Sequence, residues 1–83
     1  MVFMDKKLAV VAIIIENPDS VEKVNALLHE YREYVIGRMG LPHRERKVSV
    51  ISIVIDTTQE LINGLSGKLG MIDGVKSKVL TTK

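Results

Sequence analysis

Residues Leu8–Ile15 read LAVVAIII, an unbroken run of eight apolar side chains rich in β-branched residues. A strand with one face in water alternates apolar and polar residues, whereas this run is apolar at every position. It therefore predicts a β-strand covered on both faces. Residues Val48–Ile55 read VSVISIVI and predict a second strand of this kind, in which only serine interrupts the aliphatic side chains.

A segment with helical spacing lies between these two strands. Its apolar side chains recur every three or four positions, at Val21, Val24, Leu28, Tyr31 and Val35. This spacing predicts a helix over about Ser20–Glu33 with one apolar stripe. Asp19 is expected to cap the first turn, and Glu22, three residues later, completes an acidic variant of the capping box.

The stretch Val35–Lys47 reads VIGRMGLPHRERK and predicts an edge strand with its hairpin. A short strand is expected over Tyr34–Met39, after which Gly40, Leu41 and Pro42 begin a turn. The stretch contains four basic residues, and their charged side chains favour a hairpin that is exposed to solvent.

The last third of the chain predicts one more helix and one more strand. Thr57 and Glu60 have the spacing of a capping box at the helix start. Leucines at four-residue intervals form the expected apolar stripe: Leu61, Leu65 and Leu69. Gly70 is a good helix terminator, and Val75–Thr81 closes the chain as a strand.

The predicted element order is β-α-β-β-α-β, the split βαβ or ferredoxin-like arrangement of an α+β domain. Right-handed crossovers place both helices on one face of a four-stranded antiparallel sheet, with the fourth, first, third and second strands in that spatial order. The two most apolar strands then lie in the centre. We expect one domain over residues 7–83, preceded by a flexible tail over residues 1–6.

Two helices cover only one face of such a sheet, yet both central strands are apolar on both faces. An exposed apolar patch of this kind usually marks an interface. The sequence therefore predicts a homo-oligomer, a dimer or a tetramer, that hides the open sheet face. The alternative is a face covered by the tail or tolerated partly exposed.

Composition excludes several classes of protein. The 83 residues are 46% hydrophobic and carry a formal charge of +2. The absence of cysteine excludes disulfides, thiolate metal sites, iron–sulfur clusters and a cysteine nucleophile. No apolar segment reaches the roughly 18 residues of a membrane-spanning helix. A cytoplasmic protein is the default expectation.

Residue chemistry argues against several functions of this fold. RNA-recognition domains stack bases on aromatic side chains, whereas Ile51, Ile53 and Ile55 occupy the corresponding strand. Nucleic-acid binding by this domain alone is therefore not expected. His29 and His43 are interpreted as surface residues, and no metal or cofactor is expected. No catalytic set of residues emerges, so an enzyme is not expected.

A binding or sensing module remains. The N–H groups at the start of the first helix could hold the carboxylate of a small ligand. Arg38 offers a forked donor for an anion, and glycine lets a neighbouring backbone come close. The candidate ligand residues, drawn from two copies of the chain, are Asn17, Asp19, Ser20, Gly37, Arg38 and Gly40. In the simpler interpretation none of these residues binds a ligand. Gly37 and Gly40 then form a kink in the edge strand and a turn, Asp19 caps the helix, and Arg38 is a solvated residue of the edge strand.

The segments VIGRMGLP, KVSVISIVID and GVKSKVLTTK together resemble the small iron-only hydrogenase system regulators. That family is similar to ACT domains, which are small-molecule-binding regulatory modules, and to the C-terminal domain of the nickel-responsive repressor. The resemblance implies a ferredoxin-like fold, a dimer or tetramer, and a regulatory role. The nickel repressor uses histidines on its second strand, but Ile36–Gly40 contains none, so the nickel site is not implied here.

The prediction is therefore a non-enzymatic regulatory module that self-associates and senses a small ligand at a subunit interface. Two alternatives stay open. One is a scaffold that binds a partner protein without any small ligand. The other is a metal sensor whose site is shared between subunits.

Overall fold

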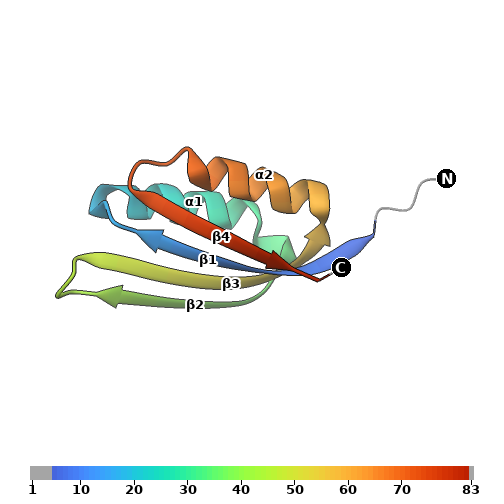
Figure 1. Cartoon of the computed structure of the whole chain (residues 1–83), viewed down its shortest axis with the longest axis horizontal. Helices are drawn as coiled ribbons and strands as arrows, with labels where there is room; N and C mark the ends of the chain where they lie inside the picture. The colour runs from blue at the N-terminus through green and yellow to red at the C-terminus, as the bar shows by residue number, and fades with distance from the viewer. Residues whose placement is uncertain (1–4, 83) are drawn as a thin grey trace.

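In the computed structural model, which describes residues 5–82, strands and helices follow each other in the expected order. The elements are β1 (Lys6–Ile15), α1 (Val21–Glu30), β2 (Val35–His43), β3 (Val48–Thr58), α2 (Gln59–Gly70) and β4 (Val75–Thr81). The strands pair as one antiparallel sheet in the order β2-β3-β1-β4. Figure 1 shows both helices on the same face of this sheet. The ferredoxin-like α+β prediction is confirmed, including its strand order.

The hydrophobic core lies between the sheet and the two helices. Alternate side chains of β1 and β3 point into it, as expected for strands whose successive residues face opposite sides. The core contains Ala9, Val11, Ile13, Ile15, Val24, Leu27, Leu28, Tyr31, Ile51, Ile53, Ile55, Ile62, Leu65 and Leu69. Burial of each larger aliphatic side chain stabilises the fold by roughly 1.5–3 kcal/mol, so this layer dominates its stability.

The edge strand β2 is longer than the sequence indicated. It continues to His43, and Gly40 pairs with Ile51 in the ladder, so the predicted turn at Gly40–Pro42 is wrong. An edge strand tolerates proline because one side of its backbone has no ladder partner. The turn lies at 44–47 instead, where Lys47 donates its backbone N–H to the carbonyl oxygen of Arg44 at 3.3 Å.

The first helix begins and ends differently from the prediction. A short 3-10 helix, η1 (Pro18–Ser20), precedes α1, so Asp19 lies inside that turn rather than at the cap of α1. Asn17 caps η1, because its Oδ1 accepts a hydrogen bond from the backbone nitrogen of Asp19 at 3.0 Å, and Ser20 is the N-cap residue of α1. At its other end α1 stops at Glu30, and a second 3-10 helix, η2 (Arg32–Tyr34), leads into β2.

The start of α2 also lies one residue later than expected. Thr58, rather than Thr57, is the cap, and its Oγ1 accepts a hydrogen bond from the backbone nitrogen of Leu61 at 3.3 Å. Thr57 still belongs to β3 and is buried. The predicted stripe is also changed at its first position: Ile62 is buried together with Leu65 and Leu69, while Leu61 is half-buried.

The N-terminal prediction is partly outside the described residues, because the expected tail covers residues 1–6 and residues 1–4 are not described. Lys6 already belongs to β1, where it pairs with Thr58 of β3. Between residues 5 and 82, no helix is both long enough and apolar enough to pass through a lipid bilayer.

Candidate functional site

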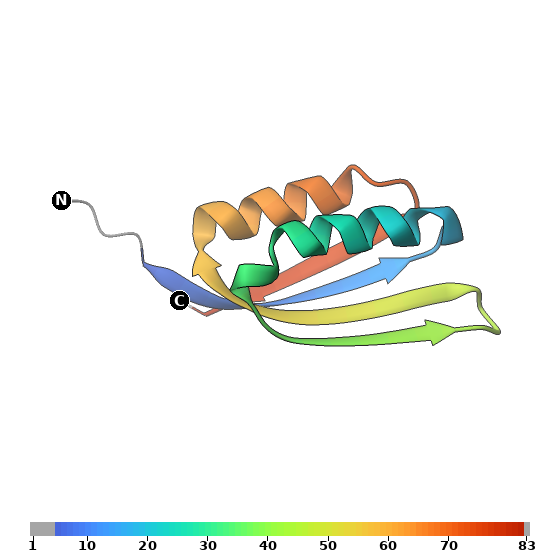
Figure 2. The ribbon, with the colours of Figure 1, turned by 180° about the vertical axis from the view of Figure 1, so that it is seen from behind.

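Figure 2 shows that, within residues 5–82, no helix lies on the face of the sheet opposite to α1 and α2. The exposed side chains of this face are mostly apolar. We call it the open face. It is formed by Leu8, Val10, Ala12, Ile14, Met39, Leu41, Val48, Val50, Val54 and Leu80. In its centre Val10 and Ile14 are 41% and 42% exposed. The prediction that both central strands are apolar on both faces is confirmed.

Charged side chains lie at the border of the open face. The ladder aligns Lys76 with Ile14 and Lys78 with Ala12, which places both lysines on the same side of the sheet, along the β4 edge. The Nζ atom of Lys76 lies 3.2 Å from Oε1 of Glu16. An apolar centre with a polar rim is the usual anatomy of a protein–protein interface.

The predicted ligand loop after β1 is tied to the loop between α2 and β4. Asn17 donates from Nδ2 to Oδ2 of Asp73 at 2.8 Å, and Ser20 donates from Oγ to the carbonyl oxygen of Asp73 at 2.6 Å. The backbone nitrogen of Glu16 donates to the carbonyl oxygen of Gly74 at 2.7 Å. These bonds give Asn17 and Ser20 a structural role in joining two loops.

The backbone donors at the start of the first helix also have partners inside the chain. Besides the bond from Asp19 to Asn17, the nitrogen of Ser20 donates to the carbonyl oxygen of Asn17 at 2.9 Å, and the nitrogen of Val21 donates to that of Pro18. The Asp19 side chain is exposed. A ligand role for Asn17, Asp19 and Ser20 stays a prediction.

The other three predicted ligand residues lie on β2, on opposite sides of the sheet. Gly37 pairs with Val54 of the open face, whereas Arg38 and Gly40 pair with Ile53 and Ile51, whose side chains enter the core. A Cβ on either glycine would meet no atom within 4 Å. Arg38 therefore reaches toward the helices, away from the open face.

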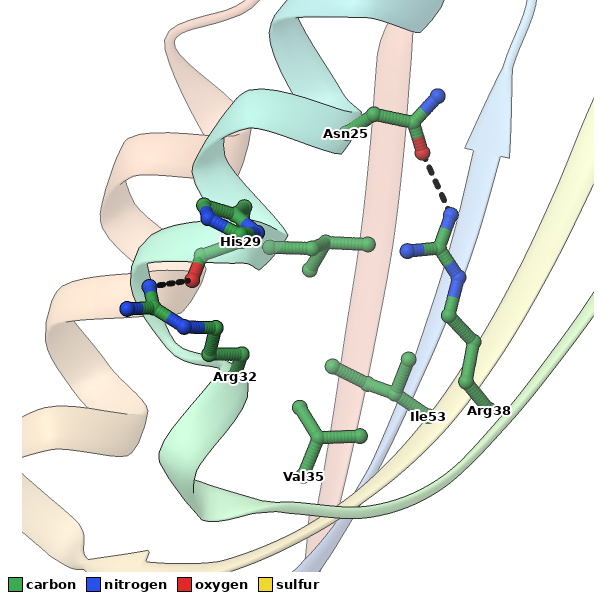
Figure 3. A pocket seen from close by; sticks show the side chains of 7 residues that line it. Asn25, His29, Arg32, Val35, Arg38 and Ile53 are labelled. Carbon is green, nitrogen blue, oxygen red and sulfur yellow. Dashed lines mark hydrogen bonds between the residues drawn. The ribbon is translucent and has the colours of Figure 1, made fainter.

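A pocket of about 280 Å³ lies between α1 and β2, and we call it the α1–β2 pocket. It is lined by Asn25, Leu28, His29, Arg32, Val35, Arg38 and Ile53. Its floor is apolar, because Leu28 and Ile53 are buried and Val35 is half-buried. Figure 3 shows Arg38 and Asn25 on one side of this floor and His29 and Arg32 on the other.

The two arginines of the α1–β2 pocket are held by neutral acceptors. Arg38 donates from Nη2 to Oδ1 of Asn25, and Arg32 donates from Nη1 to the carbonyl oxygen of His29 at 2.9 Å. Within residues 5–82 neither guanidinium forms an ion pair, and no carboxylate lines the pocket. The pocket therefore carries uncompensated positive charge.

Among the residues that line this pocket, only Arg38 was a candidate from the sequence within residues 5–82, and its neighbours Asn25, His29 and Arg32 were missed. Asn25, His29 and Arg32 follow one another at intervals of four and three residues, which is the spacing of one helix face. That spacing was the available signal. His29 is exposed, in agreement with its interpretation as a surface residue, and it borders the pocket. Among residues 5–82, no three potential metal ligands gather in one place.

These features define a small ferredoxin-like domain with a candidate association surface and a candidate pocket for an anion. A family model named TM1266-like, described as "Iron-only hydrogenase system regulator, putative", matches residues 7–79. The chain belongs to this family.

One solved structure agrees with this assignment, and two more share the fold. The uncharacterized protein TM1266 from Thermotoga maritima is 35% identical over 95% of this chain and 100% of its own, with a TM-score of 0.90. The de novo designed protein Foldit4 (12% identity, 95% of this chain and 98% of its own, TM-score 0.66) shares the fold. A formyltetrahydrofolate deformylase from Pseudomonas putida shares the fold over 89% of this chain and 28% of its own, with 16% identity and a TM-score of 0.59. No curated protein matches the chain.

Proposed function

We propose that this chain is a non-enzymatic, cytoplasmic regulatory module of an iron-only hydrogenase system, and that it works as a homo-oligomer assembled through its open face. The family supports the regulatory role, and the resemblance to ACT domains supports control by a small ligand. The open face carries the assembly part of the proposal. A regulator without a catalytic step must act through binding, and the open face is a broad apolar surface available for it.

The physical argument for assembly is the energy of apolar burial. Each 100 Å² of apolar surface removed from water contributes roughly 2.5 kcal/mol, so burying several hundred Å² offsets a substantial part of the cost of association. The open face spans three adjacent strands and includes Leu80 on the fourth. A second copy is the natural occupant, because a twofold axis pairs the same patch on both subunits.

Ligand sensing at the interface is the second part of the proposal. The sequence predicts that Asn17, Asp19 and Ser20 of one copy meet Gly37, Arg38 and Gly40 of another. Because Arg38 reaches away from the open face, such a site would need a second interface between copies, as in a tetramer. A partner protein without a small ligand, or a metal bound between subunits, is the competing role. A thermal-shift screen with amino acids, nucleotides and divalent metal ions separates these roles, because a ligand of the folded state raises the melting temperature.

The assembly is tested by sedimentation velocity over a range of protein concentrations. We expect the unmodified chain to sediment as a dimer or tetramer and the Ile14→Lys variant as a folded monomer, because a lysine in the centre of the open face would bury an unpaired charge. The matched control is Met71→Lys, which adds the same charge at a side chain that is 87% exposed and follows α2. This control should assemble normally.

Two results would overturn the proposed assembly. One is an unmodified chain that stays monomeric at every concentration. The other is an oligomer that survives both Ile14→Lys and Val10→Lys, because the interface would then lie elsewhere. Circular dichroism of each variant confirms that it has folded.

A further inference from the structure

We infer that the α1–β2 pocket binds a small aliphatic carboxylate. Its anionic end pairs with Arg38, and its hydrocarbon part covers the floor of Leu28, Val35 and Ile53. This inference deepens the ligand-sensing part of the proposed function. It places the ligand inside one chain, on the helix side of the sheet, instead of between two copies.

Arg38 is presented to the pocket in a defined position. The β2 register turns its side chain to the helix side, and the hydrogen bond to Oδ1 of Asn25 holds the guanidinium across the gap to α1. A guanidinium has five N–H donors, and within residues 5–82 the side chain of Arg38 donates to a neutral amide alone. A carboxylate is a better partner, because it brings a full negative charge and can accept two parallel N–H bonds from one guanidinium, which the single amide oxygen of Asn25 does not.

The surroundings of Arg38 favour an anion over a cation or a neutral ligand. Arg32 and His29 stand across the floor, and among residues 5–82 no acidic side chain lines the pocket. Arg32 is occupied by the carbonyl oxygen of His29, so its charge is not neutralised. A bound carboxylate would therefore place a negative charge in a pocket that two arginines line.

The floor and the volume select the rest of the ligand. The pocket, at about 280 Å³, lies near the lower end of the range of roughly 300–1,000 Å³ that is typical of ligand sites. That size suits an acid of a few carbon atoms. Inorganic phosphate would satisfy Arg38 but would leave the apolar floor in water, whereas an alkyl chain covers it.

A second hollow extends the site along α1. It measures about 290 Å³ and shares Asn25 and Arg38 with the first, so their hydrogen bond crosses a longer groove. Gly40 lines this second hollow, and a Cβ there would meet no protein atom within 4 Å. The carboxylate thus has room to approach Arg38 from either hollow, on either side of the hydrogen bond between Arg38 and Asn25.

Sodium valerate is the probe, titrated into the ¹⁵N-labelled chain at constant pH and ionic strength and followed by amide chemical shifts. We expect saturable shifts concentrated in 25–40 and around Ile53 of β3, because these residues form the pocket wall and floor. The neutral isostere valeramide should produce no saturable shift, and inorganic phosphate should bind more weakly than valerate.

Three variants sharpen the test. Arg38→Gln should weaken valerate binding about tenfold or more, because the charge partner is lost. Asn25→Asp should also weaken valerate binding, because the new carboxylate would form an ion pair with Arg38 inside the chain and compete with the ligand. Arg46→Gln removes one positive charge from the hairpin, outside the α1–β2 pocket, and should bind as the unmodified chain does.

The inference fails if valerate causes no localised saturable shift, if valeramide matches it, if phosphate binds as well, or if Arg38→Gln binds normally. The Ile14→Lys variant keeps this test separate from the proposed assembly. Valerate binding by that monomer supports a site within one chain, and loss of binding there overturns it. If the unmodified chain is monomeric and binds valerate, the proposed assembly is wrong and this inference stands. If the unmodified chain is an oligomer that does not bind valerate, this inference is wrong and the proposed assembly stands.

Discussion

Gly74 and Asn17 approach each other too closely for a side chain to fit between them. An ideal Cβ on Gly74 would lie 2.6 Å from the Cβ of Asn17 and 2.9 Å from its backbone nitrogen. Gly74 also has a φ of +70°, in the left-handed region that favours glycine. The loop between α2 and β4 is thus locked against the loop after β1, where sequence analysis placed half of the ligand residues.

The first prediction concerns this close approach. Gly74→Ala should lower the free energy of unfolding by about 2–4 kcal/mol, because it adds both backbone strain and a clash with backbone atoms. Gly67→Ala is the matched control, since a Cβ at this exposed position of α2 meets no atom within 4 Å. The control should raise stability by about 0.5–1 kcal/mol through helix propensity. Urea denaturation measures both changes, and equal effects would contradict the close approach.

The second prediction separates structural from ligand-binding roles in the same loop. Ser20 is 2% exposed, and its Oγ donates to the carbonyl oxygen of Asp73 at 2.6 Å. Ser20→Ala should lower the free energy of unfolding by about 1–2 kcal/mol, because a carbonyl group in the packed loop loses its donor. Valerate binding should not change. The control Ser66→Ala, on α2, should leave stability within about 0.5 kcal/mol. A stable Ser20→Ala variant that no longer binds valerate would assign the loop to the ligand site.

Much of the fold could be predicted from two apolar segments. Leu8–Ile15 and Val48–Ile55 are unambiguous strands, and the helical spacing between them leaves few topologies for a chain of 83 residues. Element ends were harder to predict, because neighbouring residues offer the same chemistry. Thr57 and Thr58 can both cap a helix, and only the length of the β1–β3 ladder decides between them.

The candidate site was less predictable, because it depends on a register shift. Regular alternation from Val35, which faces the core, would turn Arg38 to the open face. The bulge between Val35 and Gly37 inserts one extra residue, so Arg38 points to the helices instead. A single sequence shows no clear sign of this bulge. The helical spacing of Asn25, His29 and Arg32 was visible, but its meaning depends on where Arg38 points.

The third prediction tests the start of α2. Thr58→Ala should lower the free energy of unfolding by about 1 kcal/mol, because the first turn of the helix loses the side-chain acceptor for the backbone nitrogen of Leu61. Thr58→Ser keeps that acceptor and should retain most of the stability. Thermal unfolding followed by circular dichroism measures both variants. Equal losses in the two would show that the methyl group, and not the cap, stabilises this position.

The last prediction concerns the open face and the temperature of unfolding. If folded copies associate and unfolded chains do not, mass action raises the melting temperature as protein concentration increases. The unmodified chain should therefore melt at a higher temperature when it is more concentrated, and Ile14→Lys should melt at one temperature throughout. Met71→Lys should keep the concentration dependence, because Met71 lies beyond the end of α2, outside the open face. Scanning calorimetry at several concentrations measures the three curves. If the melting temperature of the unmodified chain does not change with protein concentration, no second copy covers the open face, and the exposed aliphatic side chains of β1 and β3 remain in water.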